Sequence, residues 1–90
     1  MPTMTLTAFC LVLHELHSSL MGLSRASEAT AGTADDIPMH LRAAFLSTEI
    51  AFFRLSGRRW RDVQRSDLDA ASPAPWVRAA HRATTAPREA

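Results

Sequence analysis

The sequence predicts an all-α fold: a small helical bundle built on an antiparallel two-helix hairpin, followed by one or two shorter C-terminal helices. Two long segments, residues 6–23 and 37–56, repeat apolar side chains at the three- and four-residue spacings of a helix. No segment alternates apolar and polar residues as a half-buried strand does. Gly32 and Gly57 follow the two segments, and glycine is common just after a helix ends.

The first segment predicts a long helix with one leucine-rich stripe. The stripe has the spacing of heptad a and d positions and comprises Leu6, Phe9, Leu13, Leu16, Leu20 and Leu23. Thr3 or Thr5 can supply the oxygen that caps the first free amides. Two ends fit the pattern: Gly22, or a weakly apolar continuation over 24–31 that stops at Gly32. Such a stripe needs a partner helix to cover it.

The second segment predicts a helix from about Ile37 to Ser56. Asp35 or Asp36 caps it, and Pro38 falls in its first turn, where a missing N–H costs little. At about 100° per residue the helix carries two nearly opposite apolar faces. One face holds Leu41, Phe45, Thr48, Phe52 and Leu55, and the other holds Met39, Ala43, Leu46, Ile50 and Phe53.

Only narrow polar edges separate the two faces of the second segment. One edge has Arg42 and Glu49, and the other has His40, Ser47 and Arg54. A helix that is apolar on both sides must be covered on both sides. The first helix covers one face, and the later segments contain few large apolar residues to cover the other. We therefore expect a homo-oligomer or an unidentified protein partner, with Met39, Ala43, Leu46, Ile50 and Phe53 as the interface.

The C-terminal part predicts two shorter helices. Trp60, Val63 and Leu68 give a thinly apolar face to a third helix from Arg58 to about Ala71. The prolines at 73 and 75 then stop and restart the chain, and a fourth helix spans Trp76–Ala83. We expect residues 1–83 to form a single helical domain and residues 84–90 a flexible C-terminal tail.

Composition narrows the class of protein. The chain has 90 residues, 47% of them apolar, and a formal net charge of +1, which excludes a disordered segment of high net charge. Its single cysteine excludes a disulfide scaffold and fits a cytoplasmic location. The apolar run from Thr7 to Leu13 is far shorter than the roughly 18 residues of a membrane span, so no membrane is expected. A secretory signal cleaved after Ala31 is the alternative, although no basic residue precedes the apolar run.

An arginine cluster supports an alternative function. All ten basic residues are arginine, and eight of them lie after residue 53, against four acidic residues. The cluster comprises Arg54, Arg58, Arg59, Trp60, Arg61 and Arg65, a composition that suits phosphate contacts with a stacking aromatic. Against this, Arg58 with Asp62 and Arg65 with Asp69 are spaced to neutralise each other on a helix. The alternative is thus a small nucleic-acid-binding regulator.

A third hypothesis is a metal site on the first helix. Cys10, His14, His17 and Met21 are spaced four, three and four residues apart and offer ligands that Zn or Cu prefers. We favour the simpler interpretation of the same residues as a buried thiol, a gap-filling thioether and two boundary histidines. Because no closed ligand pattern such as C-x-x-C is present, we expect no cofactor.

Catalysis is not expected, because nothing in so short a chain supplies an obvious cleft or oxyanion hole. The first hypothesis is therefore a small helical protein–protein interaction module, either a homodimer or an accessory or regulatory subunit. It uses the second apolar face of its central helix, with Met39, Leu46, Ile50 and Phe53 as central anchors.

Overall fold

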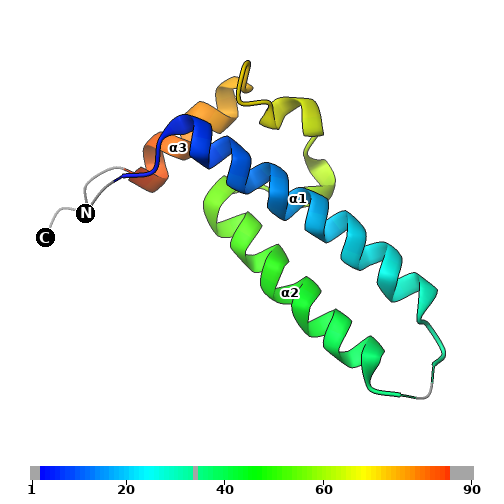
Figure 1. The fold of residues 1–90 in the computed structure, drawn as a ribbon. Helices are drawn as coiled ribbons and strands as arrows, with labels where there is room; N and C mark the ends of the chain where they lie inside the picture. The colour runs from blue at the N-terminus through cyan, green and yellow to red at the C-terminus, as the bar shows by residue number, and fades with distance from the viewer. Residues whose placement is uncertain (1–2, 34, 86–90) are drawn as a thin grey trace, which may run out of the picture.

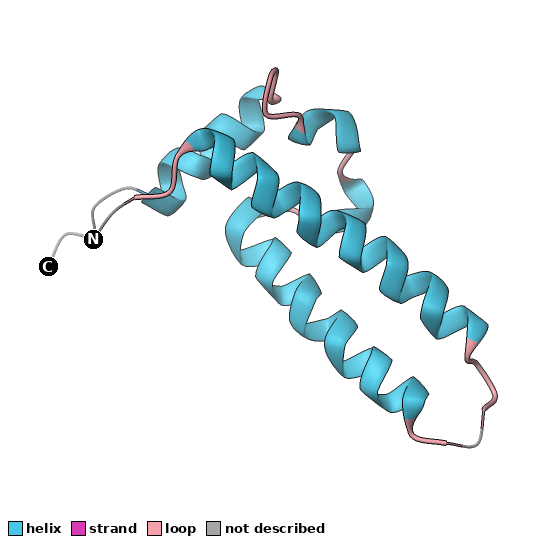
Figure 2. Ribbon diagram, in the orientation of Figure 1, coloured by secondary structure: helices cyan, strands magenta, loops and turns pink. Residues whose placement is uncertain are grey.

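The computed structural model describes residues 3–33 and 35–85, which contain helices and no strand. Two long helices, α1 (Leu6–Ala29) and α2 (Ile37–Ser56), run antiparallel and side by side (Figure 1). Two short 3-10 turns, η1 (Trp60–Asp62) and η2 (Arg65–Leu68), and a final helix, α3 (Pro75–Thr85), lie along the half of this hairpin in which α2 ends (Figure 2). Trp60 of η1 reaches the middle of both long helices, where it packs on His17 and Phe45. The predicted all-α fold and two-helix hairpin are confirmed.

Helix α1 is the longer of the two alternatives left open by the sequence. Thr5 caps it, since its hydroxyl accepts a hydrogen bond from the Ala8 amide at 3.1 Å. The helix continues past Gly22 to Ala29, although an interior glycine costs about 1 kcal/mol relative to alanine. It ends at Thr30, and Gly32 takes a positive φ of 84° in the following turn.

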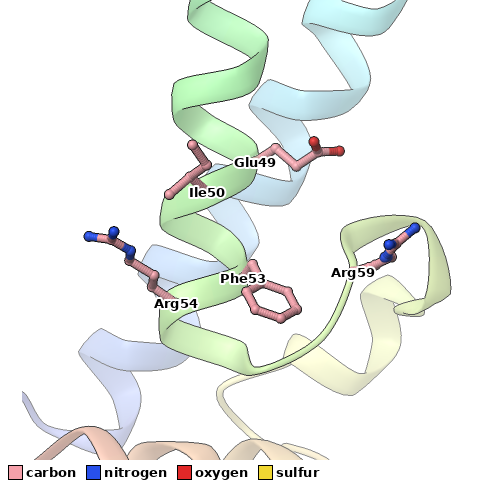
Figure 3. A pocket seen from close by; sticks show the side chains of 5 residues that line it. All are labelled: Glu49, Ile50, Phe53, Arg54 and Arg59. Carbon is pink, nitrogen blue, oxygen red and sulfur yellow. The ribbon is translucent and has the colours of Figure 1, made fainter.

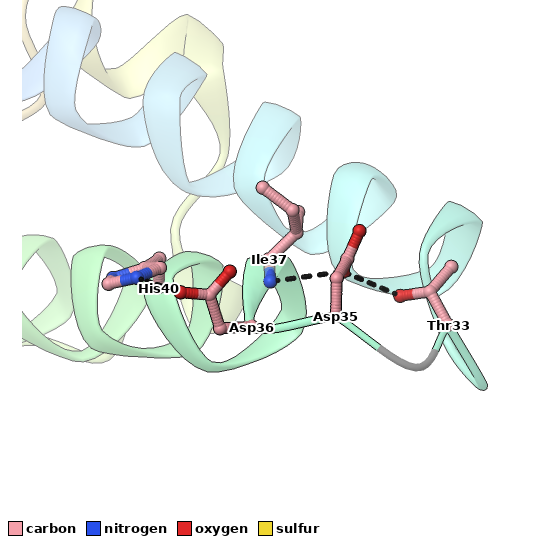
Figure 4. Close-up of polar contacts among 5 residues, drawn as sticks. All are labelled: Thr33, Asp35, Asp36, Ile37 and His40. Atoms are coloured by element: carbon pink, nitrogen blue, oxygen red, sulfur yellow. Dashed lines mark hydrogen bonds and ion pairs between the residues drawn. The ribbon is translucent and has the colours of Figure 1, made fainter.

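The turn between the helices is organised by two neighbouring aspartates. The Asp35 carboxylate accepts hydrogen bonds from the Ile37 amide at 3.1 Å and from the Thr33 hydroxyl at 3.3 Å. Asp36 holds the N-cap position of α2 and pairs with His40 one turn later, at 3.1 Å. Figure 4 shows both aspartates at this helix start. Of the two predicted caps, Asp36 occupies the N-cap position but its side chain makes no capping hydrogen bond, and Asp35 is the one whose carboxylate binds a first-turn amide.

The core lies between α1 and α2 and extends under the C-terminal elements. Its buried apolar members are Phe9, Cys10, Leu13, Leu20, Phe52, Trp60, Val63, Leu68 and Val77. Four of these come from the α1 stripe or its neighbours, and Phe52 comes from the inner face of α2. His17 is also buried, and its ring meets Phe52 and Trp60 with centroids 6.0 and 5.8 Å away.

The prediction of a helix from Arg58 to Ala71 is wrong. The structure has η1 and η2 instead, and Arg59, Gln64 and Asp69 beside them have extended backbones. The physical reason is that Trp60, Val63 and Leu68 are all buried in one core. On a helix these three side chains would spread over a wide arc. The extended residues between the turns let each of them reach the core.

Helix α3 confirms the predicted last helix and extends it slightly. It begins at Pro75, which needs no N–H partner in a first turn, and Val77 is buried in the core. Thr84 and Thr85, which we placed in the flexible tail, belong to this helix. The rest of the predicted tail, residues 86–90, lies outside the described residues.

Candidate functional site

The second apolar face of α2 is exposed along its length. We call this the α2 outer face, and it comprises Met39, Ala43, Leu46, Ile50 and Phe53. The four large side chains are 63%, 43%, 54% and 52% exposed in chain order. Neither α1 nor the C-terminal elements cover them, because those elements pack on the inner face around Phe45 and Phe52. The face is thus one contiguous apolar row on the surface.

A shallow pocket lies at the C-terminal end of the α2 outer face. It has a volume of about 470 Å³ and is lined by Glu49, Ile50, Phe53, Arg54 and Arg59. In Figure 3, Ile50 and Phe53 project from α2 between Arg54 on one side and Glu49 and Arg59 on the other. The pocket therefore combines an apolar floor with charged margins of both signs, which suits a protein side chain with an apolar stem.

One edge of the α2 outer face carries two opposite charges. Arg42 is exposed, and Glu49 stands seven residues further along the same edge. The Glu49 carboxylate accepts a hydrogen bond from the Trp60 indole N–H at 3.1 Å, which fixes its position beside the pocket. In the described part of the chain, the ion pairs are those of His14 with Glu15 and His40 with Asp36. Arg42 and Glu49 thus remain available to charges from outside.

The structure divides the arginine cluster. Trp60, expected to stack on a base, is buried, and its ring packs against Phe45 with centroids 5.9 Å apart.

The Arg61 guanidinium lies 4.9 Å from the centre of the Trp60 ring, and the Arg58 guanidinium lies 4.6 Å from the centre of the Trp76 ring. All five arginines of the cluster are exposed. No recognition helix presents these residues in the described chain, because η1 and η2 replace it.

The four residues of the predicted metal site lie in different surroundings. Cys10 and His17 are buried in the core, whereas His14 is half-buried beside Arg65 and Met21 packs at the core margin. No group of three His, Cys, Asp or Glu side chains suited to a metal ion occurs among the residues described. Burial raises the pKa of the Cys10 thiol, an effect that Arg78 opposes and Asp69 reinforces.

Sequence reasoning missed a second surface region, on the side of α1. The Arg65 guanidinium donates a hydrogen bond to the Ser18 hydroxyl at 3.0 Å, and it also lies 3.3 Å from the Nε2 of His14. Leu11 is 59% exposed and lines a neighbouring pocket of about 520 Å³. No local pattern predicts this juxtaposition, because His14 and Arg65 are 51 residues apart in the chain.

Helix α1 also bears on the membrane prediction. By length and composition, α1 is long and apolar enough to cross a membrane. The prediction considered only the apolar run of residues 7–13 and so understated the apolar length of this helix. A core helix or an N-terminal signal sequence passes the same test, and α1 uses Phe9, Leu13 and Leu20 as core residues here. The absence of a membrane partner remains a prediction.

Comparisons with family models, with curated proteins and with solved structures give no match to this chain.

Proposed function

We propose that this protein is a protein–protein interaction module that binds its partner through the α2 outer face. The observation that carries the proposal is the row of four large apolar side chains, each 43% exposed or more, on a helix whose other face is packed in the core. Single exposed apolar residues are ordinary, but a contiguous apolar row with charged margins is typical of a binding surface.

The row has the spacing by which one helix binds another. Its members stand four, three, four and three residues apart, so they follow one side of α2 over about four turns. Helix-to-helix recognition uses apolar anchors at these spacings. The pocket between Ile50 and Phe53 gives the row a cavity in which a partner's side chain can insert.

Substitution of Ile50 by aspartate tests the proposal. Ile50 is 54% exposed and lies beside the pocket, so the Ile50→Asp variant keeps the core and places a charge within the α2 outer face. We expect it to lose association with the partner, measured by size exclusion with light scattering for a self-complex or by affinity capture for another protein.

The matched control is Ala44→Asp, which adds the same charge to the same helix. Ala44 is exposed and lies about 120° around α2 from Ile50, outside the α2 outer face. This variant should associate as the wild type does. Equal association of the wild type and Ile50→Asp, with unchanged circular dichroism, would show that the face is not the interface.

A further inference from the structure

The partner of the α2 outer face can be inferred from the charges beside it, an inference that rests on the proposed function. We propose that the face binds a second copy of this chain, with the two α2 helices antiparallel about a two-fold axis near Leu46. The α2 outer face has the heptad spacing of a helix-pairing surface. Such surfaces align two helices at a shallow angle of about 20°.

The charge pattern is self-complementary in the antiparallel arrangement. Antiparallel helices bring the same edge of each copy together, so Arg42 of one copy meets Glu49 of the other, and the reverse contact forms by symmetry. The axis that pairs 42 with 49 passes midway between them, next to Leu46. Leu46 is also the middle residue of the α2 outer face, so charge and apolar contacts share one centre.

The environment of Glu49 fits this role. Its Oε2 already accepts the Trp60 indole N–H at 3.1 Å, which holds the carboxylate beside the pocket and leaves Oε1 for an arginine. A carboxylate fixed in advance loses little conformational entropy on binding. In the antiparallel pair, the second copy's Met39 end lies over the Ile50 and Phe53 end of the first. The long, flexible methionine side chain, 63% exposed here, suits the pocket between them.

A parallel pair is less favourable. It brings opposite edges together, so Glu49 meets Arg54 but Arg42 meets Ser47, which has no charge to offer. It also sets the two broader halves of the molecule side by side, because η1, η2 and α3 lie along the half of the hairpin in which α2 ends (Figure 1). The antiparallel pair instead places each broader half against the narrower half of the other copy.

The interface is short. From Met39 to Phe53 the helix rises about 21 Å, so a strip of ordinary helix width buries well under the roughly 800 Å² per partner of a standard interface. We therefore expect a reversible dimer whose population depends on protein concentration, rather than a permanent one.

Sedimentation of the full chain, which measures its molecular mass, tests the inference at protein concentrations from about 1 μM to about 1 mM. The wild type should pass from monomer to dimer. Arg42→Glu places two carboxylates opposite each other at both symmetric contacts and should weaken dimerisation about tenfold. Arg42→Glu with Glu49→Gln should recover most of that loss, because the amide removes the repulsion and its oxygen still accepts the Trp60 N–H. In about 1 M salt these differences should shrink while the wild-type dimer persists.

Arg25→Glu is the control, with the same change of charge at an exposed position of α1, outside the α2 outer face. It should dimerise as the wild type does. Loss of the dimer in Arg54→Glu with none in Arg42→Glu would replace the antiparallel pair with a parallel one. A wild type that is monomeric at every concentration overturns the inference and leaves the proposed function with a different protein as partner. A dimer that Ile50→Asp does not weaken overturns both. Circular dichroism of each variant confirms that the helices are intact.

Discussion

Cys10 shows how one residue's surroundings set its chemistry. The thiol is completely buried between α1 and the C-terminal elements, and burial raises its pKa above the ordinary value of 9.0. A buried, protonated thiol is a poor nucleophile and a poor metal ligand. The chain has no lysine and no tyrosine, so Cys10 is its one side chain that ionises between neutral pH and the arginine range.

The protein should therefore lose stability at alkaline pH because of Cys10. The folded state holds the thiol proton more tightly than the unfolded state, so the free energy of unfolding is unaffected below the unfolded pKa and falls as pH rises above about 9. Urea unfolding at about pH 8 and about pH 10.5 measures the loss. The Cys10→Ala variant has no thiol to ionise, and its stability should not fall over the same interval. A parallel fall in both proteins would assign the effect to another group.

His17 is a residue whose role only the packed structure reveals. The sequence places it on a stripe with Cys10, His14 and Met21, where it is a candidate metal ligand but more simply a half-solvated boundary residue. In the fold its Nε2 lies 3.1 Å from the Trp60 carbonyl oxygen, and its ring lies between Phe52 and Trp60. The Trp60 carbonyl also accepts the Val63 amide at 3.2 Å, so the histidine adds a second hydrogen bond there, which links α1 to the C-terminal elements.

At the scale of elements, the end of α2 depends on one glycine. Gly57 has a φ of 72°, and its amide donates to the Phe53 carbonyl at 2.7 Å, which closes the last turn. This conformation turns the chain from α2 toward η1 and so brings Trp60 into the core. No other atom lies within 4 Å of the position where a Cβ would be, so the backbone conformation alone requires glycine.

Gly57→Ala should accordingly destabilise the fold by about 1 kcal/mol, because the left-handed conformation is strained for alanine and unstrained for glycine. Gly57→Asn should cost less, since asparagine tolerates this conformation better. The two variants can be compared by urea unfolding. An alanine variant as stable as the wild type would mean that α2 ends without a left-handed residue.

Periodicity predicted α1 and α2 because a long helix repeats its apolar pattern many times. The segment 58–71 has only three large apolar residues, too few to distinguish a helix from successive turns. What decides between them is whether one core can receive all three side chains, and that depends on the position of α1 and α2. The helix α3 was predictable because proline fixes its first turn.

At the scale of the whole molecule, self-association should couple to stability. A dimer that forms only from folded chains shifts the folding equilibrium toward the native state as the concentration rises. We therefore expect the thermal midpoint of the wild type to increase between about 10 μM and about 1 mM protein, whereas that of Ile50→Asp should not. Differential scanning calorimetry measures both. A constant midpoint for the wild type would contradict the dimer as directly as sedimentation does.

The sequence by itself determined the all-α class, the two long helices and the two-sided character of α2, because each follows from periodicity and helix-end residues within one segment. Only the tertiary structure decided which face of α2 is packed, that Trp60 belongs to the core, and that Glu49 is held by the Trp60 indole. Each of these depends on contacts between segments distant in the chain. Local patterns determine which side chains seek burial, and the arrangement of the helices determines which of them obtain it.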